Sequence, residues 1–288
     1  MAKIIVFGAA GLLGRALKEK LGGEHEVVEV VRPGSRINSS QLEIDLAHPD
    51  LSILPRDADA IFYLAQSKYF REFPSKSLDM LQLNVVAPVL IADWARQYGV
   101  RKFIHCSSGG VYDENLSQLT EVLEINASRD KGFYLGTKLS SEILLRCYAK
   151  YFDSLVLLRP FFIYGPEQKS DMLIPRLVNN VKSGKPIQLQ GEEGIKINPI
   201  HVSDAAQLVS ASLRLKEFQL LNLAGPETIT IKRLCDRIGE LLCIKPIYEP
   251  AALGSQNFVA DIRQMSDLLG QPQIGISDGV KTLISLDA

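Results

Sequence analysis

The stretch KIIVFGAAGLLGRALKEKL, residues 3–21, decides the fold class of this chain. Residues 4–7 are a continuous apolar run, which is typical of a strand buried on both faces. Residues 12–21 alternate leucines with charged side chains at the spacing of an amphipathic helix. Between the two runs lies the pattern GxxGxxG. A strand, a glycine turn and a helix in this order predict the beginning of a parallel α/β sheet.

Each glycine of the turn has a steric reason. Gly8 allows the tight turn, Gly11 lets backbone amides approach a pyrophosphate, and Gly14 lets the helix pack closely on the strand. The helix N-terminus presents unpaired N–H groups and a positive dipole end to an anion. We therefore expect a dinucleotide here, although a purely structural turn is the alternative. The residues expected to hold it are Gly8, Gly11, Leu12, Leu13 and Gly14.

The same alternation continues along the chain. Short apolar runs predict strands, and longer helical patterns separate them. The expected strands are 26–31, 60–65, 102–108 and 155–160, and the expected long helices are 78–99 and 134–152. Buried parallel strands separated by helices make a doubly wound Rossmann sheet of the α/β class.

The pattern changes after residue 165. Proline and glycine become frequent, and short strands are expected at 186–190 and 218–224. We expect a Rossmann domain with the reacting groups over residues 1–165. Residues 166–288 are expected to form a smaller, partly interwoven α/β part that binds the substrate.

The composition bounds the function. The 288 residues are 46% hydrophobic and 23% charged, with a net charge of -1, as in an ordinary protein with a sizeable core. The basic excess of a nucleic-acid or membrane-surface binder is missing, and no run approaches ~20 uninterrupted apolar residues. We expect neither nucleic acid nor membrane as a partner.

The spacing of the cysteines and histidines narrows the possible functions further. The four cysteines show no CxxC spacing, and their apolar surroundings predict reduced core thiols. A reducing, cytoplasmic compartment is therefore expected. The four histidines are scattered without HxxxH or HExxH, so we expect no metal site.

The end of the second strand predicts the form of the dinucleotide. An acidic residue there accepts from the free 2′-hydroxyl of NAD, whereas an arginine accommodates the 2′-phosphate of NADP. Arg32 stands at this place, followed by Ser35 and Arg36, which favours NADP. Glu29 is the acid if the strand ends earlier. Further along, we expect Asp45 and Leu46 to flank the adenine.

Three residues predict the chemistry. Ser107 and Ser108 follow the fourth strand, at the edge of the sheet where ligands bind in such folds. Tyr134 and Lys138 lie four positions apart on a helix and so share one face. A nearby ammonium and a cationic nicotinamide favour the phenolate of a tyrosine. Tyr134 is then the general acid/base at an alcohol or ketone oxygen, Lys138 lowers its pKa and holds the nicotinamide ribose, and Ser108 polarises the substrate oxygen.

These motifs carry a resemblance that runs nearly end to end. The chain resembles an extended short-chain dehydrogenase/reductase of the nucleotide-sugar epimerase/dehydratase type. The segments concerned are GxxGxxG, FYLAQS, LNVVAPVLIADWA, SSGGVY, YLGTK, LRPFFIYGP, NPIHVSDAA, LNLAGPETITI and DIRQMSDLLG.

The resemblance implies roles for particular residues. Ser108, Tyr134 and Lys138 are its catalytic set, and Asn84 is a conformational support near the nicotinamide. It also implies cofactor contacts and a homodimer paired through helices 78–99 and 134–152. The further implied cofactor contacts are Leu64, Ala65, Gln66, Ser107, Pro160 and Ile163.

The chain departs from the family pattern at several positions. Gly109 and Gly110 occupy places where dehydratases carry Asp-Glu, which argues against dehydration. Phe162 stands near the place of an asparagine that contacts the nucleotide diphosphate in many sugar epimerases. The expected basic residue before the IHV segment appears as Lys196, with Asn198 following.

Three functions follow, in order. The first is an NAD(P)-dependent epimerase that acts on a nucleotide sugar through a transient keto intermediate. The second is an NADPH-dependent reductase of a keto sugar or other small carbonyl compound, which the NADP-like features suit. The third is a non-catalytic NAD(P)-binding regulatory protein, which has no need of the catalytic set.

Overall fold

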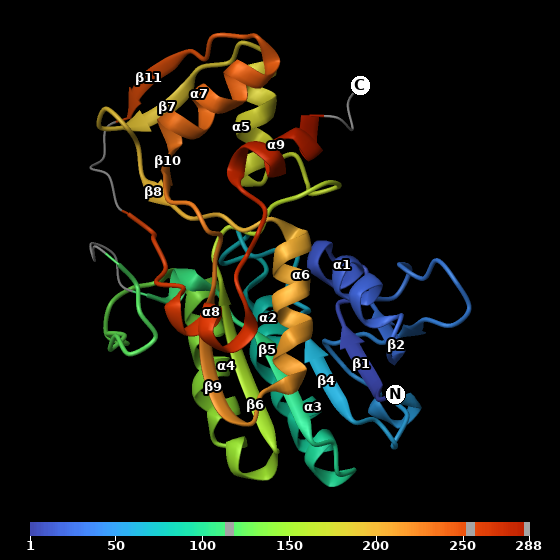
Figure 1. Ribbon diagram of the computed structural model, residues 1–288. Helices are drawn as coiled ribbons and strands as arrows, with labels where there is room; N and C mark the ends of the chain where they lie inside the picture. The colour runs from blue at the N-terminus through green and yellow to red at the C-terminus, as the bar shows by residue number, and fades with distance from the viewer. Residues whose placement is uncertain (113–117, 252–256, 285–288) are drawn as a thin grey trace. The chain divides into compact units, whose positions relative to one another are not determined.

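The computed structural model describes residues 1–112, 118–251 and 257–284 (Figure 1). The chain forms two compact units, each assembled from three segments. The first unit comprises Met1–Val111, Ile125–Arg159 and Ala206–Leu221. The second unit comprises Tyr112–Glu124, Pro160–Ala205 and Asn222–Ala288.

A seven-stranded sheet in the order β3-β2-β1-β4-β5-β6-β9 confirms the predicted doubly wound fold. The strands are β1 (Lys3–Phe7), β2 (Glu26–Val31), β3 (Leu42–Glu43), β4 (Ala60–Tyr63), β5 (Lys102–Cys106), β6 (Ser154–Pro160) and β9 (Glu217–Leu223). The five adjacent pairs from β3 to β6 are parallel. The strand order reverses at β1, which therefore marks the switch point where such sheets bind ligands.

Burial explains why the strand runs are so apolar. In β1, Ile5 is fully buried between Val28 of β2 and Ile61 of β4. Helix α1 (Leu12–Leu21) lies on one face of the sheet, whereas α3 (Ala87–Gln97) and α4 (Gly132–Arg146) lie together on the other (Figure 1). Both faces of the central strands are thus covered, and alternation of polar side chains is lost.

The helix expected at 78–99 is continuous but not uniform. It consists of α2 (Ser77–Leu81), a π-helical segment (Gln82–Val86) and α3. Pro88 lies in the first turn of α3, where a missing N–H costs little. A π segment inside an α-helix often marks a functional site, and this one carries the fully buried Asn84. Hydropathy alone could not show this irregularity.

The run Ser77–Gln97 is also long and apolar enough to cross a membrane by length and composition. Half of its most apolar window is buried within the protein. Met80, Ile91, Ala92 and Ala95 are among its fully buried side chains. Core helices of soluble proteins have the same character, so the run has an explanation in packing.

Helix α6 (Val202–Ala211) belongs to both units, since it begins in the second and ends in the first. Short 3-10 turns complete the first unit. The expected helix 134–152 begins at Gly132, ends at Arg146 and is followed by the 3-10 turn Ala149–Tyr151. The 3-10 turns are Leu51–Ile53, Gly109–Val111, Ala149–Tyr151 and Ser212–Arg214.

The second unit has its own core between helices α5 (Leu173–Lys182), α7 (Ile231–Leu242) and α9 (Ile276–Ile284), which contact one another (Figure 1). Strands β7 (Ile187–Gln190) and β11 (Tyr248–Ala251) pair in parallel, and β8 (Lys196–Ile197) pairs antiparallel with β10 (Ile229–Thr230). Helix α8 (Arg263–Leu269) lies in the last segment that the structure describes, residues 257–284.

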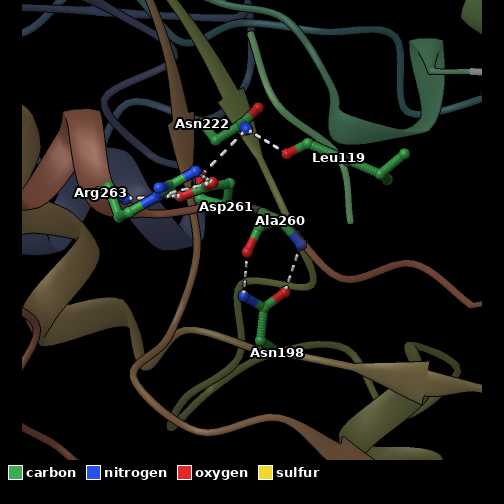
Figure 2. Close-up of polar contacts among 6 residues, drawn as sticks. All are labelled: Leu119, Asn198, Asn222, Ala260, Asp261 and Arg263. Atoms are coloured by element: carbon green, nitrogen blue, oxygen red, sulfur yellow. Dashed lines mark hydrogen bonds and ion pairs between the residues drawn. The ribbon is translucent and has the colours of Figure 1, made fainter. Parts of the chain in front are cut away.

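Two buried asparagines hold irregular segments of the second unit together (Figure 2). Asn222 donates from Nδ2 to the carbonyls of Leu119 and Asp261, at 2.8 and 3.2 Å. Asn198 both donates to and accepts from the backbone of Ala260, each at 3.0 Å. These side chains add to the few backbone hydrogen bonds that these irregular segments make with each other.

The four cysteines are free, but only two of them lie in the core. Cys106 and Cys235 are buried as expected, whereas Cys147 and Cys243 are exposed. The exposed pair follows the ends of α4 and α7, and Cys243 adopts a left-handed φ of 55°. The expectation of four core thiols was wrong here because helix ends turn their last residues to solvent.

Candidate active site

The glycine turn after β1 is as tight as the sequence predicts. Gly8 has a φ of +83°, and a Cβ there would lie 2.8 Å from the backbone nitrogen of Ala65. A Cβ on Gly14 would lie 2.3 Å from the carbonyl oxygen of Gly8. Side chains are therefore excluded at both positions, so a ligand at this turn would meet the backbone directly.

The start of α1 has the properties of an anion site. Gly11 is its N-cap, and no side chain caps the helix. The first-turn amides of Leu12, Leu13 and Gly14 have no carbonyl one turn earlier to accept their protons. These N–H groups and the helix dipole suit a pyrophosphate.

A buried hydroxyl without a hydrogen-bond partner also fits a bound dinucleotide. Ser107 follows β5, and its hydroxyl is buried without a hydrogen-bond partner. Buried polar atoms are normally paired, and orphans mark places where a ligand or water completes the contact. The residues present thus fit a nicotinamide dinucleotide, with the pyrophosphate at α1 and Ser107 further along the same edge of the sheet.

Glu29 and Arg32 have different surroundings at the end of β2. Glu29 lies inside β2, is buried, and is bound by Lys18 at 2.6 Å and by the amide of Gln41 at 2.7 Å. Its carboxylate is therefore occupied. Arg32 is exposed directly beyond the strand and donates to the Ser35 hydroxyl at 2.8 Å.

The remaining predicted cofactor residues fall into two groups. In the first unit, Leu64 donates to the carbonyl of Phe7 at 3.0 Å, and Ala65 lies against the glycine turn. Asp45 accepts from the amide of Ala47 in a local turn. Leu46 packs on the core of the first unit. Pro160 and Ile163 make up the second group and belong to the second unit.

Tyr134 and Lys138 lie near the start of α4, on the face expected from their spacing. The Tyr134 hydroxyl donates to Oε1 of Gln66 at 2.9 Å. Lys138 is fully buried and donates from Nζ to the carbonyl of Cys106 at 3.0 Å. Ser108 is half-buried beyond β5, and its hydroxyl accepts from the amide of Gly110 at 3.2 Å.

The electrostatics of this set differ from the expectation. Burial raises the pKa of Tyr134, the Cys106 thiol raises it further, and a hydrogen bond with Ser108 lowers it. Burial lowers the pKa of Lys138 to about 8, against the attraction of Cys106 and Glu142. Burial thus opposes the ionisation of Tyr134 that its spacing to Lys138 was expected to favour. A bound nicotinamide cation would add positive charge, which favours the phenolate.

A polar brace that the sequence did not reveal surrounds Asn84. Its Oδ1 accepts from the amide of Ser67 at 3.2 Å, and its Nδ2 donates to the Thr137 hydroxyl at 2.9 Å. Thr137 in turn donates to the carbonyl of Tyr134 at 2.7 Å. Asn84 therefore reaches the catalytic helix through Thr137. Sequence reasoning named Asn84 but missed its two partners, since their residue types are ordinary in a helix and a loop.

A buried ion pair lies one turn beyond Lys138. Arg159 of β6 donates to both carboxylate oxygens of Glu142, at 3.1 and 2.6 Å, and both side chains are almost fully buried. A buried charge is retained only when it is paired. An arginine inside the apolar run LVLLRP is the signal in the sequence that such a partner exists.

The departures from the family pattern also have structural correlates. A Cβ on Gly110 would meet Leu135 at 2.8 Å, so an acidic side chain there would require Leu135 to move. Phe162 has a left-handed φ of 46°, a conformation that asparagine adopts more readily, and its ring packs edge-on against Phe258. The amide of Asn198 is already taken by Ala260 (Figure 2).

Taken together, the first unit places a dinucleotide site and a proton-transfer group at the carboxyl edge of one sheet. Tyr134 can give a proton to an oxygen or take one from it, and Ser108 can polarise that oxygen. Among residues 1–112, 118–251 and 257–284, no group of three His, Cys, Asp or Glu side chains is placed to hold a metal ion.

The buried ammonium of Lys138 predicts a measurable cost in stability. We expect Lys138→Met to raise the free energy of unfolding near pH 7 by about 1–3 kcal/mol. The lowered pKa means that the folded state binds a proton less readily than the unfolded state. The penalty is therefore complete below about pH 8 and disappears as the pH rises toward 10.5, the ordinary pKa of a lysine.

Urea unfolding of both proteins across this pH range measures the effect. The exposed Lys150→Met serves as the control and should change little. A destabilised Lys138→Met protein, or a difference that does not shrink with rising pH, would show that the bond to Cys106 outweighs desolvation.

Comparison with known proteins completes the assignment. Residues 4–224 match the model of the NAD dependent epimerase/dehydratase family. The chain is 28% identical to a UDP-glucose 4-epimerase of Mycolicibacterium smegmatis, over 96% of each chain, and 24% identical to an uncharacterised UDP-glucose epimerase of Bacillus subtilis, over 98% and 97%. The structure of a UDP-glucuronic acid 4-epimerase from Bacillus cereus in complex with NAD superimposes with a TM-score of 0.85 at 25% identity, over 98% and 96% of the chains. The chain belongs to the NAD dependent epimerase/dehydratase family, and it is an enzyme of the extended short-chain dehydrogenase/reductase type.

Proposed function

We propose that this enzyme epimerises a nucleotide sugar, with a UDP-sugar as the first candidate. The observation that carries the proposal is the set of Ser108, Tyr134 and Lys138 beside a dinucleotide turn, without acidic residues at Gly109 and Gly110. The similar proteins named above are UDP-sugar epimerases, which supports the substrate class. Because the sequence identity is low, the proposal extends to the reaction type and the nucleotide-sugar class, not to one sugar.

The residues of the chain divide the work as follows. Tyr134 takes the proton from a sugar hydroxyl as that carbon becomes a ketone, and it returns the proton when the alcohol forms again. Ser108 donates to the same oxygen and polarises it. Lys138 holds positive charge behind the phenol and is placed to bind the nicotinamide ribose. When bound, a nicotinamide would supply reversible hydride transfer, which keeps the overall reaction redox-neutral.

Turnover of candidate sugars tests this function. Incubation with UDP-glucose or UDP-glucuronic acid should give the 4-epimer, separable by chromatography. Tyr134→Phe should lower the rate by at least about 100-fold, since it removes the proton carrier, and should leave dinucleotide binding intact. The exposed Tyr151→Phe is the matched control. Equal turnover by the Tyr134 variant would refute the assigned role.

A second function has specific support. The exposed Arg32 and Ser35 suit the 2′-phosphate of NADP, and Phe162 replaces an amide with an aromatic ring in the second unit. Both features suit an NADPH-dependent reductase of a keto sugar or other small carbonyl compound. Consumption of NADPH with such a ketone, without epimerisation, would establish it. The intact catalytic set argues against a purely regulatory protein.

We propose a preference for NADP over NAD from the same features. Arg32→Ala should weaken NADP binding about 10-fold or more, the loss of one charge-assisted contact, and leave NAD binding nearly unchanged. Calorimetric titration with each dinucleotide measures this, with the exposed Arg56→Ala as control. Release of near-stoichiometric NAD from the denatured protein would contradict the preference, and the related Bacillus cereus structure does hold NAD.

We also propose a homodimer through the helices of the first unit. Apolar side chains are exposed on α2, α3 and α4: Leu78 at 74%, Ile143 at 58% and Leu90 at 45%. A second copy would cover them. Light scattering after size exclusion should give twice the mass of the chain, and Ile143→Glu should give the monomer. Ile53→Glu, at an exposed isoleucine outside these helices, should remain dimeric.

A further inference from the structure

A closed circuit of contacts surrounds the catalytic tyrosine. The Tyr134 hydroxyl donates to Gln66, and the neighbouring amide of Ser67 donates to Asn84. Asn84 donates to Thr137, which donates back to the carbonyl of Tyr134. Both ends of the Gln66–Tyr134 bond are therefore attached to the same brace. The circuit joins three separate segments: the residues after β4, the π segment and the start of α4.

The brace is anchored by side chains in the interior of the protein. Ser67, Asn84 and Thr137 are buried, and the Ser67 hydroxyl donates to Asp79 of α2. Gln66, by contrast, is exposed, so its side chain is free to turn while its backbone stays in place. The ring of Phe70 lies 5.5 Å from that of Tyr134 and limits the other side of the phenol.

The chemistry of an amide suits this place. A neutral phenol needs an acceptor, whereas a phenolate needs a donor. A carboxylate supplies only the first and an ammonium only the second. The glutamine amide supplies both after a half turn about its terminal bond.

We propose that Gln66 is a positioning residue that keeps Tyr134 aimed in both of its protonation states. Oε1 accepts from the neutral phenol, as in the structure, until the O–H turns about its C–O bond toward the sugar oxygen to give its proton. When the phenol has given its proton to the sugar oxygen, the reversed amide donates from Nε2 to the phenolate. The proton moves only between Tyr134 and the substrate oxygen, and Gln66 keeps its own protons throughout. The inference rests on the proposed function insofar as Tyr134 is the acid/base.

Several other groups face the phenol of Tyr134. From β5 it faces the Cys106 thiol, from the following turn Ser108, and from its own helix Lys138. On the segment after β4, Arg71 lies 4.8 Å over the ring of Phe70, and the Ser67 hydroxyl contacts the Asp79 carboxylate. Besides the hydrogen bond with Ser108, the phenol donates to Gln66 at 2.9 Å.

Two substitutions of opposite charge test the proposal. Gln66→Glu can only accept and adds a negative charge, so it should favour the neutral phenol. Gln66→Lys can only donate and adds a positive charge, so it should favour the phenolate. We expect the ratio of phenolate to phenol at a given alkaline pH to fall at least about tenfold in the first and to rise about tenfold in the second.

The readout is the ultraviolet difference spectrum of the phenolate, titrated with saturating oxidised dinucleotide, with Tyr134→Phe as the blank. Gln219→Glu, at a half-buried glutamine of the same unit, is the charge control and should leave the midpoint unchanged. Structural damage would move both Gln66 variants in the same direction. Such a result, or midpoints equal to that of the wild type, would overturn the proposal.

Kinetics then separate this inference from the proposed function. If an active substrate is found, both Gln66 variants should lower kcat more than they raise KM, and the pH profile of kcat should follow the spectroscopic midpoints. If no candidate sugar turns over, the titration still decides the role of Gln66. The epimerase assignment and the role of Gln66 can therefore fail independently.

Discussion

The close approach of two backbones at Gly8 is the constraint on which the site depends. The turn after β1 lies so near Ala65 that any side chain at Gly8 would collide with the backbone there. Because β1 and β4 are neighbours in the sheet, the contact aligns the dinucleotide turn with the segment that follows β4. That segment carries Gln66 and Ser67, which contact Tyr134 and Asn84. The phosphate end and the proton-transfer end of the site are thus built on one shared junction.

Buried polar groups then hold the catalytic helix at a cost in stability. Lys138 keeps an ammonium in the core, with its pKa lowered to about 8 by burial. The Glu142–Arg159 pair and the Asn84–Thr137 bond lie in the same layer. Apolar side chains of similar volume would stabilise the fold more. The proposed function, which needs a charge and a fixed tyrosine at the edge of the sheet, gives a reason for their presence.

The choice between epimerase and reductase turns on features outside the catalytic set. Under both proposals the same serine, tyrosine and lysine transfer the proton. The proposals differ in whether the dinucleotide stays bound through the cycle, and the segment beyond β2 is where the adenosine ribose is expected to bind. There Arg32 is exposed while Glu29 is engaged inside the strand. The aromatic pair Phe162–Phe258 in the second unit alters the surroundings in which a nucleotide diphosphate would be recognised.

Local patterns in the sequence were sufficient for the fold class, the bounds of β1, α1 and β2, the glycine turn and the Tyr134–Lys138 spacing, because hydrophobic period and glycine sterics act over a few residues. Tertiary structure alone decided what depends on distant segments. It showed the π segment at Asn84, the engagement of Glu29 by Lys18 and Gln41, and two cysteines exposed at helix ends. It also revealed that burial raises the pKa of Tyr134, an effect that the spacing to Lys138 could not indicate. The hydrogen bond from Tyr134 to Gln66 joins residues far apart in the chain, and only the folded sheet brings them within reach.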